Sequence, residues 1–343
     1  MNISRKAMLT FCLCLVLLLS AYPAVKVQAS TQGTTAPAAS QSKKIYVNVA
    51  VATLWKQPGG TRTMDKAVMS VPVNMEGWTG GMTLRDKYWL VGKAETEALY
   101  GQEVEILQTK GSWVQVAVKG QVTAKNPKGY PGWMPKSQVI TQQTDAHSQA
   151  LASVKTKTAY LYNPDKKTHF LEVSFNTRLP LVEQDGDWIQ VFTPANQVKL
   201  VKKSEINIYE NASAIPRPAK PADLVATGKQ FLGLPYLWSG VSGFGFDCSG
   251  FTSSIYKYYG MTIPRDASEQ AKQGTPISKN KLQPGDLLFF AYNNGKGKVH
   301  HVAMYAGNGM MLHSPNSARS VEIIPMATAP YKQEYAGARR YLK

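Results

Sequence analysis

The stretch GFGFDCSG, residues 243–250, decides how the C-terminal part of this chain folds. Its glycines shape a loop, and the loop delivers Cys248 to the first turn of a helix that we expect to run to Tyr259 and to stop at Gly260. The unpaired N–H groups and the dipole of a helix start favour negative charge, so they lower a thiol pKa and help to hold an oxyanion. Each such effect is worth only about 0.3–2 kcal/mol, so a thiolate nucleophile also needs a base.

A strand expected over 300–306 carries the candidate base. His300 and His301 are neighbours in it, and neighbouring strand side chains point to opposite faces, so only one of them can face Cys248. We expect His301 to be the base and His300 to be a structural residue.

A return strand over 310–313 ends in His313, a second candidate. A two-residue turn at Asn308-Gly309 would place His313 on the face away from His301. A three-residue loop, or one bulge, would place it on the same face, two positions from His301. If His313 orients His301, the hairpin must therefore take the second form.

The order of elements around Cys248 indicates an α+β domain over 222–343. A helix entered at Pro221 and closed near Gly233 precedes the helix of Cys248. The strands 287–292, 300–306 and 310–313 follow, and helices followed by an antiparallel run of strands are typical of that class.

A weak internal repeat occupies the region before this domain. Each copy has a short strand, a turn with glycine, an alternating strand that begins with Trp113 or Trp188, and a closing Lys-Ser segment. The pattern resembles the bacterial SH3-type barrel, an all-β fold, and predicts one such domain over 44–145 and another over 147–208. An insertion in the first copy, 58–88, should form loops or short helices.

The remaining segments are interpreted as export and linker sequences. Residues 1–29 have a basic start, an apolar run and a small-residue cleavage site, which is typical of a signal peptide; a retained membrane anchor is the alternative. Residues 30–43 are small and polar and predict a flexible tether, and 209–221 is a proline-rich linker. We expect a secreted protein associated with the cell wall.

Cysteine content and charge narrow the function further. Two of the three cysteines lie in the predicted signal peptide, so Cys248 is the one thiol of the mature chain, and it is either reactive or a buried inert residue. The net charge of +17 favours binding to anionic wall polymers, unless it serves only solubility. Nothing in the chain predicts a cofactor, a metal or a nucleic-acid partner, and we expect a monomer.

The motifs of the C-terminal domain resemble those of the NlpC-type peptidases. They fall in the family's order, and they are PYLWSG (235–240), DCSGF (247–251), PR (264–265), PGDL (284–287) and HVAMY (301–305). The resemblance implies a papain-like fold and cleavage of murein stem peptides next to D-glutamate linked through its γ-carboxyl. It further implies roles for single residues: Cys248 as nucleophile, His301 as base, His313 as polar third residue, Tyr236 beside the nucleophile, and Trp238, Asp247 and Ser249 lining the cleft.

With two barrels ahead of the catalytic domain, the chain is similar to a subgroup, the γ-D-glutamyl–diamino acid endopeptidases. That resemblance implies that Glu95 and Tyr130 of the first barrel hold the free amine of a terminal L-alanine; the alternative is that Glu95 is a solvated surface residue. The chain departs from the family at Ala267, where a serine is common.

The leading hypothesis is hydrolysis of the γ-D-glutamyl–diamino acid bond in muropeptides. An endopeptidase of intact murein, a non-catalytic wall-binding protein, and a zinc site made of Cys248, His301 and His313 are the alternatives. The sequence does not identify the diamino acid.

Overall fold

The structure is a computed structural model, and it describes residues 43–142 and 149–342. The predicted signal peptide and nearly all of the predicted tether lie outside the described residues, as does the junction predicted at 145–147. Within the described ranges, no helix is both long and apolar enough to cross a membrane.

The first part of the chain forms a seven-stranded sheet in the order β3-β2-β6-β5-β4-β1-β7. Its alternating strand Trp113–Val118 turns Val114 and Val116 into a core in which both are fully buried. The short helices predicted for 58–88 are confirmed. The elements are β1 (Lys44–Val47), β2 (Val51–Trp55), η1 (Thr63–Asp65), α1 (Lys66–Met69), α2 (Met75–Gly81), α3 (Leu84–Trp89), β3 (Ala94–Leu99), β4 (Glu103–Lys110), β5 (Trp113–Val118), β6 (Tyr130–Pro135), η2 (Lys136–Gln138) and β7 (Val139–Gln142).

The second part repeats this topology strand by strand. Its seven-stranded sheet has the order β10-β9-β13-β12-β11-β8-β14. Each strand takes the place in this sheet that the strand numbered seven lower takes in the first sheet, so β8 corresponds to β1 and β14 to β7. The internal repeat seen in the sequence is therefore confirmed. The elements are β8 (Leu151–Val154), β9 (Thr158–Tyr162), β10 (His169–Ser174), β11 (Arg178–Asp185), β12 (Trp188–Phe192), β13 (Val198–Lys202), η3 (Lys203–Glu205) and β14 (Ile206–Tyr209).

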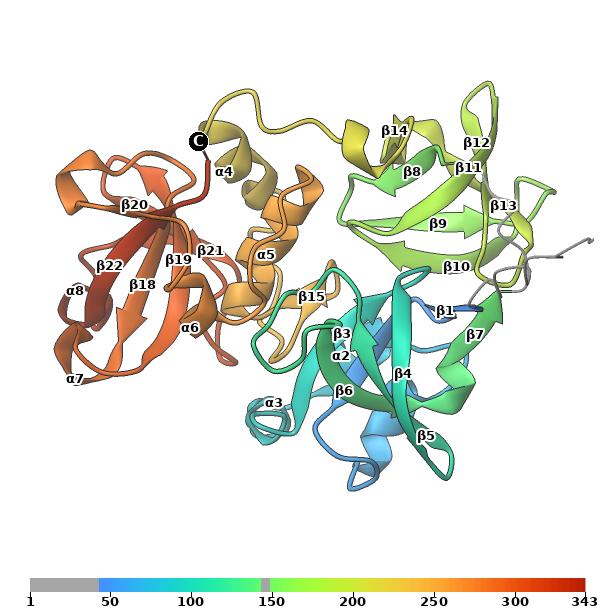
Figure 1. Cartoon of the computed structure of the whole chain (residues 1–343), viewed down its shortest axis with the longest axis horizontal. Coiled ribbons are helices and arrows are strands. Elements are labelled where there is room, and N and C mark those ends of the chain that lie inside the picture. The colour runs from blue at the N-terminus through green and yellow to red at the C-terminus, as the bar shows by residue number, and fades with distance from the viewer. Residues whose placement is uncertain (1–42, 143–148, 343) are drawn as a thin grey trace, which may run out of the picture. The chain divides into compact units, whose positions relative to one another are not determined.

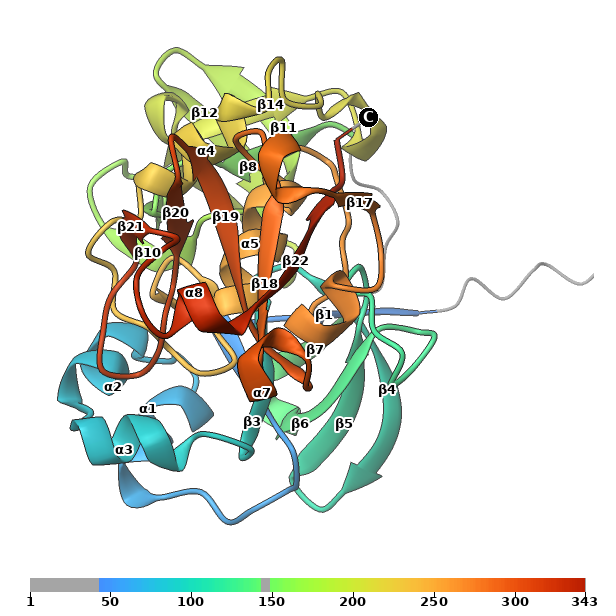
Figure 2. The same ribbon diagram turned by 90° about the vertical axis from the view of Figure 1, so that its left-hand side faces the viewer.

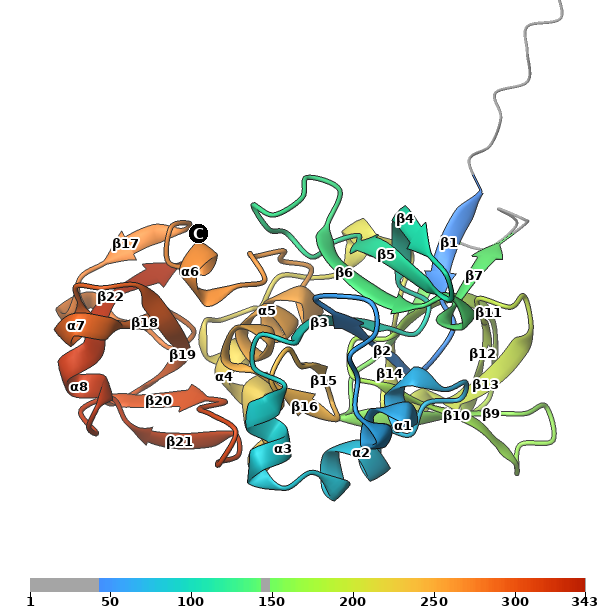
Figure 3. The same ribbon diagram turned by 90° about the horizontal axis from the view of Figure 1, so that it is seen from below.

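The C-terminal part is an antiparallel six-stranded sheet, β17-β22-β18-β19-β20-β21, with α4 and α5 on one of its faces (Figures 1, 2 and 3). This is the predicted α+β order. The elements are η4 (Ala212–Ala214), α4 (Ala222–Lys229), β15 (Val241–Ser242), β16 (Gly245–Phe246), α5 (Cys248–Tyr258), α6 (Ala267–Gln270), β17 (Thr275–Ile277), η5 (Lys279–Lys281), β18 (Leu287–Ala291), α7 (Tyr292–Gly295), β19 (Val299–Gly307), β20 (Met310–His313), β21 (Glu322–Pro325), α8 (Tyr331–Glu334) and β22 (Tyr335–Arg340).

Helix α5 is fixed against this sheet by its apolar side. Phe251 and Ile255 are fully buried in a core shared with Val302 of β19 and Leu312 of β20. At its start the helix lies so close to the preceding loop that a Cβ atom on Gly250 would stand 2.0 Å from the carbonyl oxygen of Gly240. The glycine of the DCSG motif is therefore required by close backbone approach, and this approach holds the first turn of α5 in place.

Candidate active site

Cys248 is the first residue of α5, as the sequence predicted. Asp247 is the N-cap, and its carboxylate accepts a hydrogen bond of 2.7 Å from the backbone N–H of Gly250. The backbone N–H groups of Val302 and Ser249 bond the sulfur, so the thiol lies against β19 at the residue that follows His301.

Burial raises the pKa of the Cys248 thiol to about 12; the negative charge of Asp247 adds to this effect, and the two N–H groups oppose it. The N–H of Ser249 in the first turn of α5 lowers this pKa, as expected of a helix start, but the loss of water has the larger effect and the net shift is upward. The direction of this shift favours the neutral thiol over the thiolate.

The hairpin of β19 and β20 contains the bulge that the sequence argument required. Met304 pairs with Leu312 and Tyr305 with Met311, but Gly307 pairs with Met310, so Ala306 is the extra residue. His313 consequently lies on the face of His301, and His301 Nε2 is 2.9 Å from His313 Nδ1.

A relay of side chains continues from this buried pair towards the surface. His313 is fully buried, and its Nε2 lies 3.1 Å from Glu322 Oε1, which the register of β20 and β21 places directly opposite. Arg319 in turn donates to Glu322 Oε2 at 2.6 Å. Sequence reasoning missed Glu322, because nothing in the segment 314–321 fixes the register of β21.

The relay defines the tautomers of both rings. Glu322 can only accept, so His313 donates from Nε2 and accepts at Nδ1. His301 must then donate from Nε2, which leaves its Nδ1 unprotonated. Burial lowers the pKa of His301 well below 6.5 and that of His313 to about 3, so both rings are neutral near pH 7. His301 is thus held in the form of a base.

His300 is the extra residue of a bulge in β19, because Phe290 pairs with His301 and Ala291 with Val299. The alternation of faces is interrupted there, so the opposite orientation of His300 and His301 stays a prediction. The ring of His300 stacks on Tyr292 with 4.3 Å between the centroids, and its Nε2 is 3.2 Å from Glu334 Oε2. These contacts lie away from the relay and agree with a structural role.

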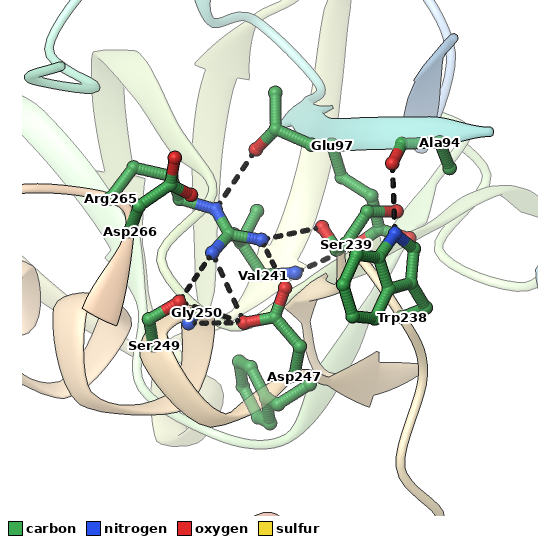
Figure 4. Close-up of polar contacts among 12 residues, drawn as sticks. Ala94, Glu97, Trp238, Ser239, Val241, Asp247, Ser249, Gly250, Arg265 and Asp266 are labelled. Atoms are coloured by element: carbon green, nitrogen blue, oxygen red, sulfur yellow. Dashed lines mark hydrogen bonds and ion pairs between the residues drawn. The ribbon is translucent and has the colours of Figure 1, made fainter. Parts of the chain in front are cut away.

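Arg265 joins several of the predicted cleft residues (Figure 4). Its guanidinium makes two bonds to Asp247, of 2.6 and 3.0 Å, and one of 3.0 Å to the Ser249 hydroxyl. It also donates to the backbone oxygen of Ser239 and to the Thr96 hydroxyl of the first barrel. Asp247 and Ser249 are thereby held next to Cys248, and their contact with substrate stays a prediction.

The two aromatic residues predicted near the nucleophile lie on the segment before α5. Tyr236 is buried, and burial raises its pKa well above 10, with the charge of a Cys248 thiolate as the next cause. Trp238 donates from Nε1 to the backbone oxygen of Ala94 at 2.9 Å (Figure 4). The segment is therefore bonded to strand β3, and Tyr236 lies within electrostatic range of the thiol.

Glu95 and Tyr130 of the first barrel meet a carboxylate of the C-terminal part. The Tyr130 hydroxyl lies 3.0 Å from Asp266 Oδ2 and 3.3 Å from Glu95 Oε2. Burial raises the pKa of Tyr130, and the negative charge of Asp266 adds to this effect, so the hydroxyl keeps its proton. Two carboxylates thus share one hydroxyl, and the side chain of Glu95 is only 20% exposed, which disfavours its interpretation as a solvated surface residue.

Sequence reasoning also missed Asp266 and assigned no role to Arg265, although both stand in the stretch PRDAS. Across residues 43–142 and 149–342, no group of three or more His, Cys, Asp and Glu side chains is arranged to hold a metal ion.

Two parts of the chain match models of known protein families. The model of the NlpC/P60 family matches residues 233–340, and that of the YKFC SH3b2 domain matches residues 154–209. A Gamma-D-glutamyl-L-lysine dipeptidyl-peptidase of Bacillus cereus is 50% identical over 307 residues, 88% of this chain and 92% of that protein. The protein of the same name from Bacillus subtilis is 38% identical over 296 residues, 85% of this chain and 96% of its own length.

A crystal structure of an NlpC/P60 family protein from Bacillus cereus superposes with a TM-score of 0.84 at 50% identity, covering 88% of this chain and all of that one. The fold is therefore papain-like with an SH3b-type domain ahead of it, and the protein is a peptidase, a hydrolase of peptide bonds. The chain belongs to the NlpC/P60 family.

Proposed function

We propose that the protein hydrolyses the γ-D-glutamyl–diamino acid bond of peptidoglycan stem peptides, in muropeptides that begin with a free L-alanine. The main support for the proposal is a pair of carboxylates, Glu95 of the first barrel and Asp266 of the C-terminal domain, which both contact the Tyr130 hydroxyl. Two carboxylates that share a hydroxyl favour a cationic ligand, and a terminal ammonium is such a ligand. The two relatives named above, which match most of the chain, carry the name of this activity.

The reaction begins from the neutral thiol and imidazole. The Cys248 thiol passes its proton to Nδ1 of His301 while the sulfur attacks the γ-carbonyl carbon of D-glutamate. The carbon–nitrogen bond then breaks, the imidazolium of His301 protonates the leaving amine of the diamino acid, and an acyl-enzyme remains. Water attacks this thioester with His301 as the base, which releases L-alanyl-γ-D-glutamate and restores the thiol.

His313 and Glu322 act on His301 by orientation. When His301 takes up the proton of the thiol, the Nδ1 atom of His313 still accepts from Nε2, and the carboxylate of Glu322 stabilises the added positive charge through His313. We assign Tyr236 to the immediate surroundings of the sulfur. Trp238, together with Asp247 and Ser249, is assigned to the cleft wall.

The proposal extends to location and partners. We infer that residues 1–29 direct export, and that the basic mature chain works in the cell wall, as a monomer, among anionic polymers. The substrate is a muropeptide released from glycan rather than intact murein, because an amine clamp requires a free terminus.

The test compares Cys248→Ala with the unmodified protein on the tripeptide L-Ala-γ-D-Glu-L-Lys and on its N-acetylated form, with products identified by mass. We expect cleavage of the free tripeptide only, and no cleavage by the variant, whose unfolding curve should match that of the parent. Substantial turnover by the variant would refute the nucleophile, and equal rates on the two peptides would refute the amine clamp.

A further inference from the structure

The carboxylate pair of the proposed substrate site already holds an ammonium group, supplied by the protein itself. Lys125 Nζ lies 2.6 Å from Glu95 Oε2, contacts the Tyr130 hydroxyl and is 3.6 Å from Asp266 Oδ2. It also lies 4.3 Å from the centroid of the Tyr130 ring, a cation–π distance. One side chain therefore touches all three groups assigned to the amine of the substrate.

The loop that carries Lys125 is anchored on the C-terminal part. This loop, residues 119–129, connects β5 to β6, and Val122 forms a bridge with Pro264. The backbone N–H of Ala124 donates to Glu269 Oε1 at 2.8 Å. The backbone next to Lys125 is thus fixed over the site. The position of the ammonium group therefore follows from a loop that is anchored on the C-terminal part, not from a freely moving segment.

The side chain itself can leave. Lys125 is 42% exposed, whereas Glu95 is 20% exposed, so the lysine can swing into water about its flexible stem while the carboxylates stay in place. In the described part of the chain, Lys125 is the one cation that forms an ion pair with Glu95 or Asp266. Its departure without replacement would leave Glu95 and Asp266 without an ion-pair partner among the described residues, with only the charge of Arg265 acting on Asp266.

We propose that Lys125 is an internal competitor of the substrate: its ammonium group fills the amine clamp between turnovers and is exchanged for the terminal ammonium of the incoming peptide. This inference rests on the proposed function. The exchange swaps one cation for another, so the net charge of the site does not change. By mass action, an occupied clamp weakens the binding of substrate and of the product L-alanyl-γ-D-glutamate by the same factor, which favours product release.

The kinetic test uses Lys125→Met, with Lys125→Arg as a charge-retaining variant and Lys128→Met as the matched control. Lys128 lies on the same loop but pairs with Glu105 instead. A partly exposed ion pair of this kind corresponds to a change of about two- to fivefold in binding. We expect Lys125→Met to lower KM for the free tripeptide, and the inhibition constant of the dipeptide, by about that factor. The kcat of Lys125→Met should equal that of the parent, and Lys128→Met should show the parent's KM, kcat and inhibition constant.

A second readout does not depend on turnover. In the Cys248→Ala background, acetylation of lysines followed by mass spectrometry measures how accessible each amine is. Adding L-alanyl-γ-D-glutamate should increase the labelling of Lys125 and leave that of Lys128 unchanged.

The outcomes separate the two proposals. A rise of KM in Lys125→Met would make Lys125 a substrate-holding residue, and an unchanged KM with unchanged labelling would remove its role; either result overturns the inference. Equal cleavage of free and N-acetylated tripeptide by the parent would instead overturn the amine clamp, whatever Lys125 does.

Discussion

Replacing Glu97 by glutamine should make the protein more stable, by an amount that grows as the pH rises from about 4.5 to about 7. Glu97 is a fully buried residue of β3, and its Oε2 accepts a hydrogen bond of 2.9 Å from the backbone N–H of Val241. Burial raises the pKa of Glu97 from 4.5 to about 7, against the opposing effects of the bonds from Val241 and Ser242 and of the Arg265 charge. Glutamine has almost the same shape and can accept the same bond, but it never ionises.

Proton linkage gives the sign and the size of the change in the free energy of unfolding. The folded state holds the proton of Glu97 more tightly than the unfolded chain does, so stability from this group is fully present below pH 4.5 and is lost as the pH rises through about 7. A tenfold change in proton affinity is worth about 1.4 kcal/mol, so ionising Glu97 costs the folded protein about 3 kcal/mol. Glu97→Gln escapes that cost.

Urea unfolding of the parent and of Glu97→Gln at pH values from about 5 to about 9 measures the difference in the free energy of unfolding. We expect a difference near zero at the acidic end that grows in favour of the variant to about 3 kcal/mol at the basic end. Glu76→Gln is the control, because Glu76 is an exposed residue of the same domain. A gap between parent and Glu97→Gln that does not change with pH would refute the reasoning.

Two further predictions concern the relay and the Cys248 thiol. Glu322→Gln should lower kcat at least about tenfold and leave KM unchanged, because His313 loses the anion that fixes its tautomer; steady-state kinetics on the tripeptide measures both constants, and a change confined to KM would contradict the relay. Because burial raises the pKa of Cys248 to about 12, its alkylation by iodoacetamide should keep accelerating beyond pH 9. A plateau near neutral pH would instead indicate a preformed thiolate–imidazolium pair.

The sequence predicted the parts of the site that local pattern controls. Cys248 at a helix start and the repeated barrel both follow from residue order and period. The position of His313 was predictable only as a condition, because one bulge decides which face it takes. Lys125 and Glu322 could not be found in this way, since each reaches its partner through packing between segments with no shared sequence pattern.

Three consecutive residues of β3 show why the first barrel belongs to the active site. Glu95 lies at the proposed amine clamp, Thr96 accepts a bond of 3.0 Å from Arg265, and Glu97 accepts one from the segment before α5. Arg265 also donates to the carboxylate of Asp247, the N-cap of the helix that begins with Cys248. The clamp and the sulfur are thus joined by a chain of short, buried bonds, which fixes the distance between them. Under the proposed function, a site of fixed length that anchors a terminal ammonium would select the bond at a set distance from that terminus, and a dipeptide rather than a longer fragment would be removed.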